Sequence, residues 1–104
     1  MFGPGVRTIT TAQLAERLAR GKPVLLDVRE PSEFATGHVP DARNVPLGGL
    51  AAASARLDPL AETLVICRSG RRSVTAARQL KRAGFADVYS VAGGTAAWDG
   101  KLER

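Results

Sequence analysis

Short apolar runs and amphipathic stretches alternate along the chain. Two continuous apolar runs of strand length, residues 24–28 and 64–66, have the pattern of strands that are buried on both faces of a parallel sheet. Shorter stretches at residues 6–9, 43–45 and 88–91 predict three further strands. The pattern therefore predicts a sheet of about five strands.

The first predicted helix has sequence signals at both of its ends. Thr10 is placed to cap the helix, Gln13 completes a capping box, and Ile9 and Leu14 are spaced as a hydrophobic staple. Gly21 ends the helix. This helix follows the first predicted strand directly.

Four further segments have the composition and the end signals of helices. They alternate with the predicted strands, which favours an α/β fold: a central, mostly parallel sheet with helices on both faces, built as a single domain over residues 1–104. The helical segments are residues 31–34, residues 49–57, a helix that opens at Ser73 and closes at Gly84, and residues 95–98.

Length and composition are those of a globular protein. The chain has 104 residues, of which 44% are hydrophobic and 24% charged. No apolar run approaches the roughly 20 residues that span a bilayer, and residues 1–10 lack the parts of a secretory signal, so we expect no membrane association. One cysteine, Cys67, excludes a disulfide framework and a multi-cysteine zinc site; we expect no metal, no cofactor and a reducing, cytoplasmic setting.

The chain has a net charge of +5, and its basic residues form a cluster at one place only. A basic chain can bind nucleic acid, but this one has only five aromatic residues and its basic residues are scattered, so we expect no nucleic-acid partner. The exception is a cluster of Arg68, Arg71 and Arg72 beside Cys67, which indicates a site for a small anion. The bias towards alanine and arginine is typical of bacterial proteins.

Cys67 follows a predicted buried strand and precedes a predicted helix, which is where open α/β sheets bind ligands. Gly70 supplies the backbone freedom for a tight loop, whose N–H groups can form a nest for an anion. These N–H groups, the helix dipole and the neighbouring arginines would lower the pKa of the Cys67 thiol. Such a thiolate is a nucleophile that needs no histidine as a base.

Each of these residues also has a simpler interpretation. A lone cysteine is most often a small buried hydrophobic residue, and loop arginines are often only solvated charges. The strand end, the glycine and three arginines within five residues of Cys67 favour the nucleophile. Arg72 adds a modest hint, because a cation beside a helix N-terminus has the wrong sign for the helix dipole.

Short motifs follow one another in a fixed order along nearly the whole chain. In this order and spacing they resemble the single-domain members of the rhodanese (thiosulfate sulfurtransferase) family. Asp41 departs from the pattern, since the family often has glycine there, and this affects only a turn. The motifs are LLDVR at 25–29, EF at 33–34, GHVP at 37–40, ARNVP at 42–46, VICRSGRRS at 65–73, GG at 93–94 and AW at 97–98.

The resemblance implies that Cys67 is the catalytic cysteine. Its thiolate would take the outer sulfur of a small anionic donor such as thiosulfate, hold it as a persulfide and pass it to cyanide, a thiol, or a protein or cofactor-pathway acceptor. We expect Arg72 to orient the donor, Arg68 and Arg71 to steer it, and the chain to be a monomer. The implied substrate-binding residues are Arg68, Ser69, Gly70, Arg71, Arg72 and Ser73.

Three further residues are placed to border this site. Asp27 and Arg29 lie at the end of the first long strand, and parallel strands end at the same edge of a sheet. We interpret this pair as an ion pair or a turn contact that fixes the loop to Glu33. His38, the only histidine, lies between a glycine and a valine, and we interpret it as a hydrogen-bonding scaffold.

Two other functions compete with sulfur transfer. One is a rhodanese-like sulfur-carrier or regulatory binding module with little turnover; regulatory modules of that class commonly lack the cysteine that this chain keeps. The other is a small cysteine-dependent phosphatase of the Cys-x5-Arg type. Only four residues separate Cys67 from Arg72, and this shorter loop forms a smaller cradle, which favours sulfur over a tetrahedral phosphate.

Overall fold

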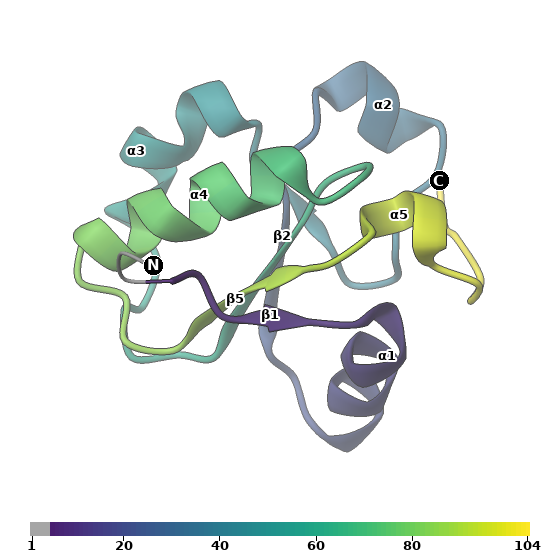
Figure 1. Ribbon diagram of the computed structural model, residues 1–104. Coiled ribbons are helices and arrows are strands. Elements are labelled where there is room, and N and C mark those ends of the chain that lie inside the picture. The colour runs from purple at the N-terminus through teal and green to yellow at the C-terminus, as the bar shows by residue number, and fades with distance from the viewer. Residues whose placement is uncertain (1–4) are drawn as a thin grey trace.

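A five-stranded parallel sheet forms the centre of the computed structural model, which describes residues 5–104 (Figure 1). Residues 1–4 of the expected domain, and of the stretch in which we expect no secretory signal, lie outside the described part. The strand order is β1-β5-β4-β2-β3, and all four neighbouring pairs are parallel. The strands are β1 (Thr8–Ile9), β2 (Val24–Asp27), β3 (Arg43–Asn44), β4 (Thr63–Ile66) and β5 (Val88–Val91).

The central strands β2 and β4 are buried on both faces, which is why their sequences are continuously apolar. Successive side chains point to opposite faces of the sheet. Leu25 and Leu64 accordingly belong to one hydrophobic cluster, and Leu26 and Val65 belong to the other. All four side chains are at most 1% exposed.

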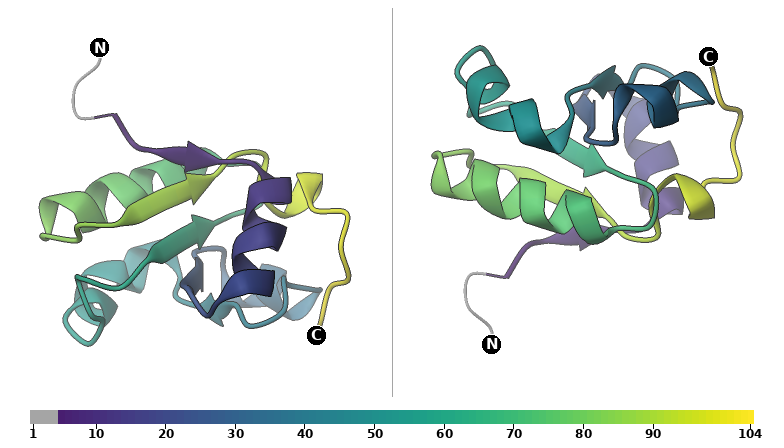
Figure 2. Two further views of the ribbon diagram at one scale, coloured as in Figure 1. Left: turned by 90° about the horizontal axis from the view of Figure 1, so that it is seen from below. Right: turned by 90° about the horizontal axis from the view of Figure 1, so that it is seen from above.

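Helices cover both faces of the sheet (Figure 2). In the view from above, α3 and α4 lie in front of the sheet, and their residues join the cluster of Leu26 and Val65. In the view from below, α1 lies in front, and its Leu14 joins the cluster of Leu25 and Leu64. The helices are α1 (Thr11–Arg20), α2 (Pro31–Ala35), the 3-10 helix η1 (Leu47–Gly49), α3 (Leu50–Ser54), α4 (Arg71–Arg82) and α5 (Gly94–Ala97).

The predicted start of α1 is confirmed. The Gln13 N–H donates to the Thr10 hydroxyl at 3.0 Å, and the Thr10 N–H donates to the Gln13 side chain at 2.8 Å. Ile9 and Leu14 share one core cluster, as the hydrophobic staple predicts. The helix ends at Gly21, also as predicted.

The α/β fold with a parallel sheet and helices on both faces is confirmed. The bounds of α2 and α5 differ from the expectation by one residue, and those of α3 and α4 differ by more. The loop after Cys67 was expected to reach Arg72, but α4 already begins at Arg71, because Gly70 in a left-handed conformation serves as its N-cap. The helix expected over 49–57 is only α3, preceded by η1, since turns take over after Ser54. Within residues 5–104, no helix is long and apolar enough to cross a membrane.

Candidate active site

Cys67 follows β4 directly, and the loop that leads into α4 curls around its sulfur. The Gly70 N–H donates to the Cys67 Sγ at 3.1 Å, and the Ser73 N–H donates to it at 3.3 Å. The cysteine is 1% exposed. The backbone therefore surrounds the sulfur with hydrogen-bond donors, which is the nest that the sequence predicted.

Gly70 makes this curl possible. Its φ of +102° lies in the region that other residues rarely adopt, and a Cβ atom there would stand 3.2 Å from the backbone nitrogen of Gly93. The loop is thus packed against the turn that follows β5. Any side chain at position 70 would strain the backbone and push the two segments apart.

Two buried serines add hydroxyl groups to the N–H donors around the Cys67 sulfur. The Ser73 Oγ lies 3.6 Å from the Cys67 Sγ and 2.7 Å from the Ser90 Oγ. Ser90 belongs to β5, and both serines are fully buried. When Cys67 is a thiolate, the Ser73 hydroxyl can donate to the sulfur while the Ser90 hydroxyl donates to Ser73.

These contacts govern the acidity of the thiol. Burial by itself raises the pKa of Cys67, but hydrogen bonds from the Ser73 hydroxyl and from the N–H groups of Ser73, Gly70 and Ser69 favour the thiolate. The result is a pKa of Cys67 below the ordinary value of 9.0. The site therefore stabilises a nucleophilic thiolate, mainly with neutral donors.

The three arginines of the loop differ in their partners. Arg72 forms two hydrogen bonds to the Glu33 carboxylate on α2, at 2.6 Å and 3.0 Å. Arg72 and the N–H of Glu30 lower the pKa of Glu33 to about 2, so this carboxylate is charged at neutral pH. Arg68 and Arg71 are exposed, and within residues 5–104 no carboxylate lies within 4.0 Å of either guanidinium.

The short helix α5 fastens the loop from the other side. The Thr95 N–H donates to the Cys67 carbonyl at 2.8 Å, and the Ala96 N–H donates to the Arg68 carbonyl at 3.0 Å. Gly94 permits this approach, because its φ is +59° and a Cβ atom there would overlap the Cys67 carbonyl oxygen. The backbone on both sides of the Cys67–Arg68 peptide is therefore fixed.

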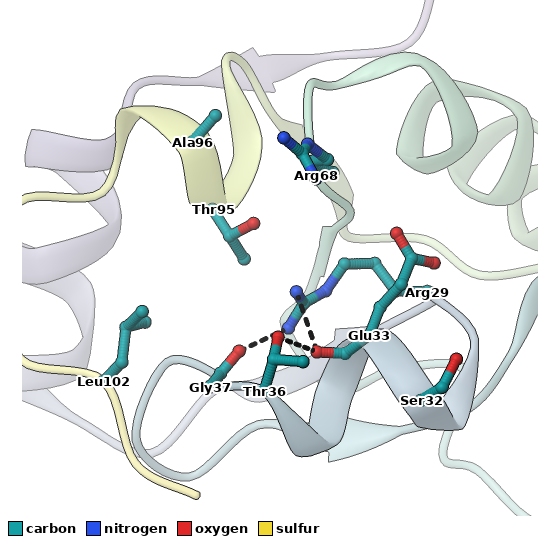
Figure 3. A pocket seen from close by; sticks show the side chains of 9 residues that line it. All are labelled: Arg29, Ser32, Glu33, Thr36, Gly37, Arg68, Thr95, Ala96 and Leu102. Carbon is teal, nitrogen blue, oxygen red and sulfur yellow. Dashed lines mark hydrogen bonds between the residues drawn. The ribbon is translucent and has the colours of Figure 1, made fainter.

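Asp27 and Arg29 form a buried ion pair at the end of β2, next to β4. The Arg29 Nε and Nη2 donate to the Asp27 carboxylate at 2.8–3.1 Å. Arg29 also donates to the Gly37 carbonyl at 2.8 Å, a contact drawn in Figure 3, and to the Glu33 carbonyl at 3.4 Å. This is the ion pair fixing the α2 loop that the sequence suggested.

His38 lies on the segment after α2. Its ring stacks on Phe34 with the centroids 3.8 Å apart, and its Nδ1 is 3.2 Å from the Phe34 carbonyl oxygen. Its backbone pairs with Glu103 through two hydrogen bonds of 2.8 Å. These contacts agree with the interpretation of His38 as a scaffold.

Comparison with known proteins places this geometry in a family. The family model of the Rhodanese-like domain matches residues 10–101. The chain belongs to this family. The resemblance carried by its motifs is therefore confirmed over nearly the whole chain.

Three relatives illustrate the breadth of the rhodanese-like family. GlpE, the thiosulfate sulfurtransferase of Pseudomonas putida, is 38% identical, covering 88% of this chain and 84% of that protein. YrkF of Bacillus subtilis, provisionally named a sulfur carrier protein, is 42% identical over 76% of this chain, which spans only 43% of YrkF. The crystal structure of a rhodanese-like domain protein from Staphylococcus aureus has a TM-score of 0.86 and 32% identity, covering 94% of this chain and 97% of that one.

In this rhodanese-like domain Ser69, Gly70 and Ser73 provide the donors around the Cys67 sulfur, whereas Arg72 is paired with Glu33 and Arg68 lines the neighbouring pocket. Three contributors were missed: Glu33 as the partner of Arg72, Ser90 behind Ser73, and Thr95, whose N–H holds the Cys67 carbonyl. Ser90 left a signal in the sequence, because it is a polar residue within an apolar strand. Glu33 and Thr95 left no comparable signal of their partners.

Proposed function

We propose that Cys67 carries a sulfane sulfur from a small anionic donor, such as thiosulfate or a persulfide, to a thiophilic acceptor. The observation that carries the proposal is the ring of donors around the Cys67 Sγ, formed by Gly70, Ser73 and the Ser73–Ser90 pair. The proposal is further supported by membership of the rhodanese-like family and by relatives that are named sulfurtransferases.

The first half-reaction loads the cysteine. The Cys67 thiolate attacks the outer sulfur of thiosulfate, a new S–S bond forms, and the S–S bond of the donor breaks with its electron pair leaving on sulfite. No proton has to move, because nucleophile, donor, product and leaving group are all anions. The loop N–H groups can hold the anionic persulfide in place of the thiolate.

The second half-reaction unloads the cysteine. An acceptor nucleophile, such as cyanide, attacks the outer sulfur of the persulfide and leaves with it. The electron pair of the broken S–S bond returns to the Cys67 Sγ, which becomes a thiolate again. The same donors that lower the pKa of Cys67 make this sulfur a good leaving group.

We propose that Arg72 orients the donor while its guanidinium stays paired with Glu33. The Glu33 carboxylate already occupies both terminal nitrogens of its guanidinium. Arg72 would therefore act on the donor while remaining paired. We expect Arg72→Ala to weaken thiosulfate use more than His38→Ala does, and equal losses would rule out this role.

Intact-mass measurement tests the proposal directly. The wild-type protein, incubated briefly with thiosulfate in the absence of reductant, should gain one sulfur atom, and cyanide should remove it. Cys67→Ser should gain none. Failure of the wild type to gain sulfur from both thiosulfate and a polysulfide would overturn the proposal.

A sulfur carrier with little turnover is the second candidate, and the provisional name of YrkF favours it. Both candidates predict a persulfide on Cys67. They differ in the steady-state rate of thiocyanate formation from thiosulfate and cyanide. Many turnovers per minute would support the sulfurtransferase, whereas stoichiometric loading without turnover would support the carrier.

A further inference from the structure

A pocket of about 390 Å³ lies beside the Cys67 loop, between α2, α5 and the C-terminal segment (Figure 3). Its volume is in the range of small-molecule sites. Arg68 closes one side of it, and Thr36 and Gly37 lie on the opposite side. Leu102 adds an apolar patch to its wall.

Among the residues that line the pocket, only Arg68 has a charge that no ion pair within residues 5–104 neutralises. Arg29 also lines it, but this residue is 5% exposed and its guanidinium is paired with Asp27. The Glu33 carboxylate at the rim is paired with Arg72. Arg68 is exposed and has no carboxylate within 4.0 Å among residues 5–104.

Hydroxyl groups supplement the charge of Arg68. Ser32 and Thr95 line the pocket, and within the described part of the chain neither hydroxyl makes a hydrogen bond to the protein. A carboxylate accepts hydrogen bonds from guanidinium and hydroxyl groups alike. The free donors of this pocket therefore suit a carboxylate.

The pocket lies next to the backbone of the reacting residue. Arg68 follows Cys67 in the chain, and Thr95 and Ala96 of the pocket wall donate to the carbonyls of Cys67 and Arg68. The donor's outer sulfur must enter the loop itself. An acceptor attacks from outside, so its body needs a place next to the loop, and the pocket provides one.

We propose that this pocket binds the sulfur acceptor, and that the acceptor is a small thiol bearing a carboxylate. Arg68 pairs with the carboxylate, and Leu102 contacts the carbon chain. The acceptor thiol gives its proton to the anionic outer sulfur of the Cys67 persulfide, and the resulting thiolate attacks that sulfur. The S–S bond breaks, and its electron pair returns to the Cys67 Sγ. The acceptor leaves as a persulfide that keeps the proton. This inference rests on the proposed function.

The test compares two probes that differ only in charge: 3-mercaptopropionate and its amide. The persulfide is first formed with thiosulfate, excess donor is removed, and loss of the sulfur is followed by intact mass at equal thiolate concentrations. Only the loaded fraction is followed, so differences in loading do not enter. The wild type should lose its sulfur to the acid about fivefold faster than to the amide.

Three variants locate the source of this preference. Arg68→Gln should bring the ratio of the two rates close to one. Arg78→Gln removes the same charge from an exposed position on α4 outside the pocket, and it should keep the ratio. Arg71→Gln, at the start of α4 and outside the pocket lining, should lower both rates alike and keep the ratio as well.

Two results would overturn the inference. One is a wild-type ratio near one; the other is a ratio that Arg68→Gln leaves unchanged or that all three variants lower equally, since a general positive field would then explain it. A binding measurement separates this inference from the proposed function. In Cys67→Ser, which cannot be loaded, 3-mercaptopropionate should shift the amide resonances of Arg68, Thr95 and Leu102, and the additional Arg68→Gln change should abolish these shifts.

Discussion

The adjacent strands β2 and β4 end at the same edge of the sheet, but the acidic groups at their ends, Asp27 and Cys67, are stabilised in different ways. Asp27 at the end of β2 faces a full positive charge, since Arg29 holds its carboxylate with three hydrogen bonds. At Cys67, directly after β4, the hydrogen-bond donors among residues 5–104 are neutral groups, and the charge of Arg72 adds to them without a hydrogen bond to the sulfur. The Cys67 sulfur is surrounded by N–H and hydroxyl groups, which carry no net charge.

The difference separates a scaffold from a reactive group. A buried carboxylate locked to an arginine has its lone pairs occupied, and it keeps the chain after β2 in place. A thiolate held by dipoles is stabilised enough to form but keeps a lone pair for attack. The fixed N–H groups of the loop can also stabilise the negative charge of a persulfide without rearranging.

Cys67→Ser tests the reactive side of this comparison and has the largest expected effect. Sulfur transfer to cyanide should fall at least about a thousandfold, because the hydroxyl is a poor nucleophile at neutral pH. The free energy of unfolding should change by no more than about 1 kcal/mol, since the side chain keeps its size and its N–H donors. Steady-state assays and urea unfolding measure the two quantities. A loss of activity that matched a loss of folded protein would contradict the assignment.

Asp27→Asn tests the scaffold side. It leaves the buried Arg29 guanidinium without a countercharge, which should lower the free energy of unfolding by about 3 kcal/mol. The pH dependence of Cys67 alkylation should stay nearly the same in the protein that remains folded. Asp41→Asn is the matched control at an exposed position whose φ of +71° asparagine tolerates, and it should cost no more than about 0.5 kcal/mol. A shift of the alkylation profile in Asp27→Asn would mean that the two strand ends are coupled.

Ser73→Ala tests how far a neutral donor stabilises the Cys67 thiolate. Loss of the hydroxyl removes one of the groups that lower the pKa of Cys67, so the profile of alkylation rate against pH should move to higher pH. Sulfur uptake at pH 7 should fall about three- to tenfold, as expected for one hydrogen bond of this kind. Ser90→Ala should shift the profile in the same direction but less, because Ser90 acts only through Ser73. An unchanged profile in Ser73→Ala would show that the backbone N–H groups suffice.

Glu33→Gln tests the partly exposed ion pair with Arg72 and has a small expected effect on stability. The pKa of Glu33 is lowered from 4.5 to about 2, so its ion pair with Arg72 stabilises the folded state at neutral pH, and this contribution is lost as the pH falls from about 4.5 through about 2. Because the pair is partly exposed, the variant should lose about 1 kcal/mol or less at pH 7. Urea unfolding at pH 7 and pH 3 should show the difference from the wild type shrinking at pH 3. Glu16→Gln, an exposed control on α1, should show no such difference at either pH.

Much of the fold could be predicted because its signals are local. The capping box at Thr10 and Gln13 and the apolar runs of β2 and β4 depend on residues within a few positions of one another. The start of α4 was missed by two residues, since the sequence does not show that Gly70 adopts a left-handed conformation and caps the helix. Boundaries of this kind are decided by one residue's backbone angles rather than by a periodic pattern.

In the candidate site too, contacts between near neighbours in the chain could be predicted, and contacts between distant residues could not. The loop from Cys67 to Ser73 could be predicted because its donors lie within six residues of the sulfur. The ion pair of Arg72 joins residues 39 positions apart, and the Ser73–Ser90 hydrogen bond joins residues 17 positions apart. Arg72 therefore appeared in the sequence as an unpaired charge, although it holds a carboxylate from α2.

The sequence by itself determined the order of strands and helices, the two-sided burial of the central strands and the placement of a cysteine before a glycine-containing loop. Each follows from periodicity or from short-range backbone geometry, which neighbouring residues dictate. Only the tertiary structure decided which arginines stay free, which hydroxyl polarises Ser73 and where a pocket opens beside the loop. Those features join segments that are distant along the chain, and they exist only because parallel strands end at one edge and bring these segments together.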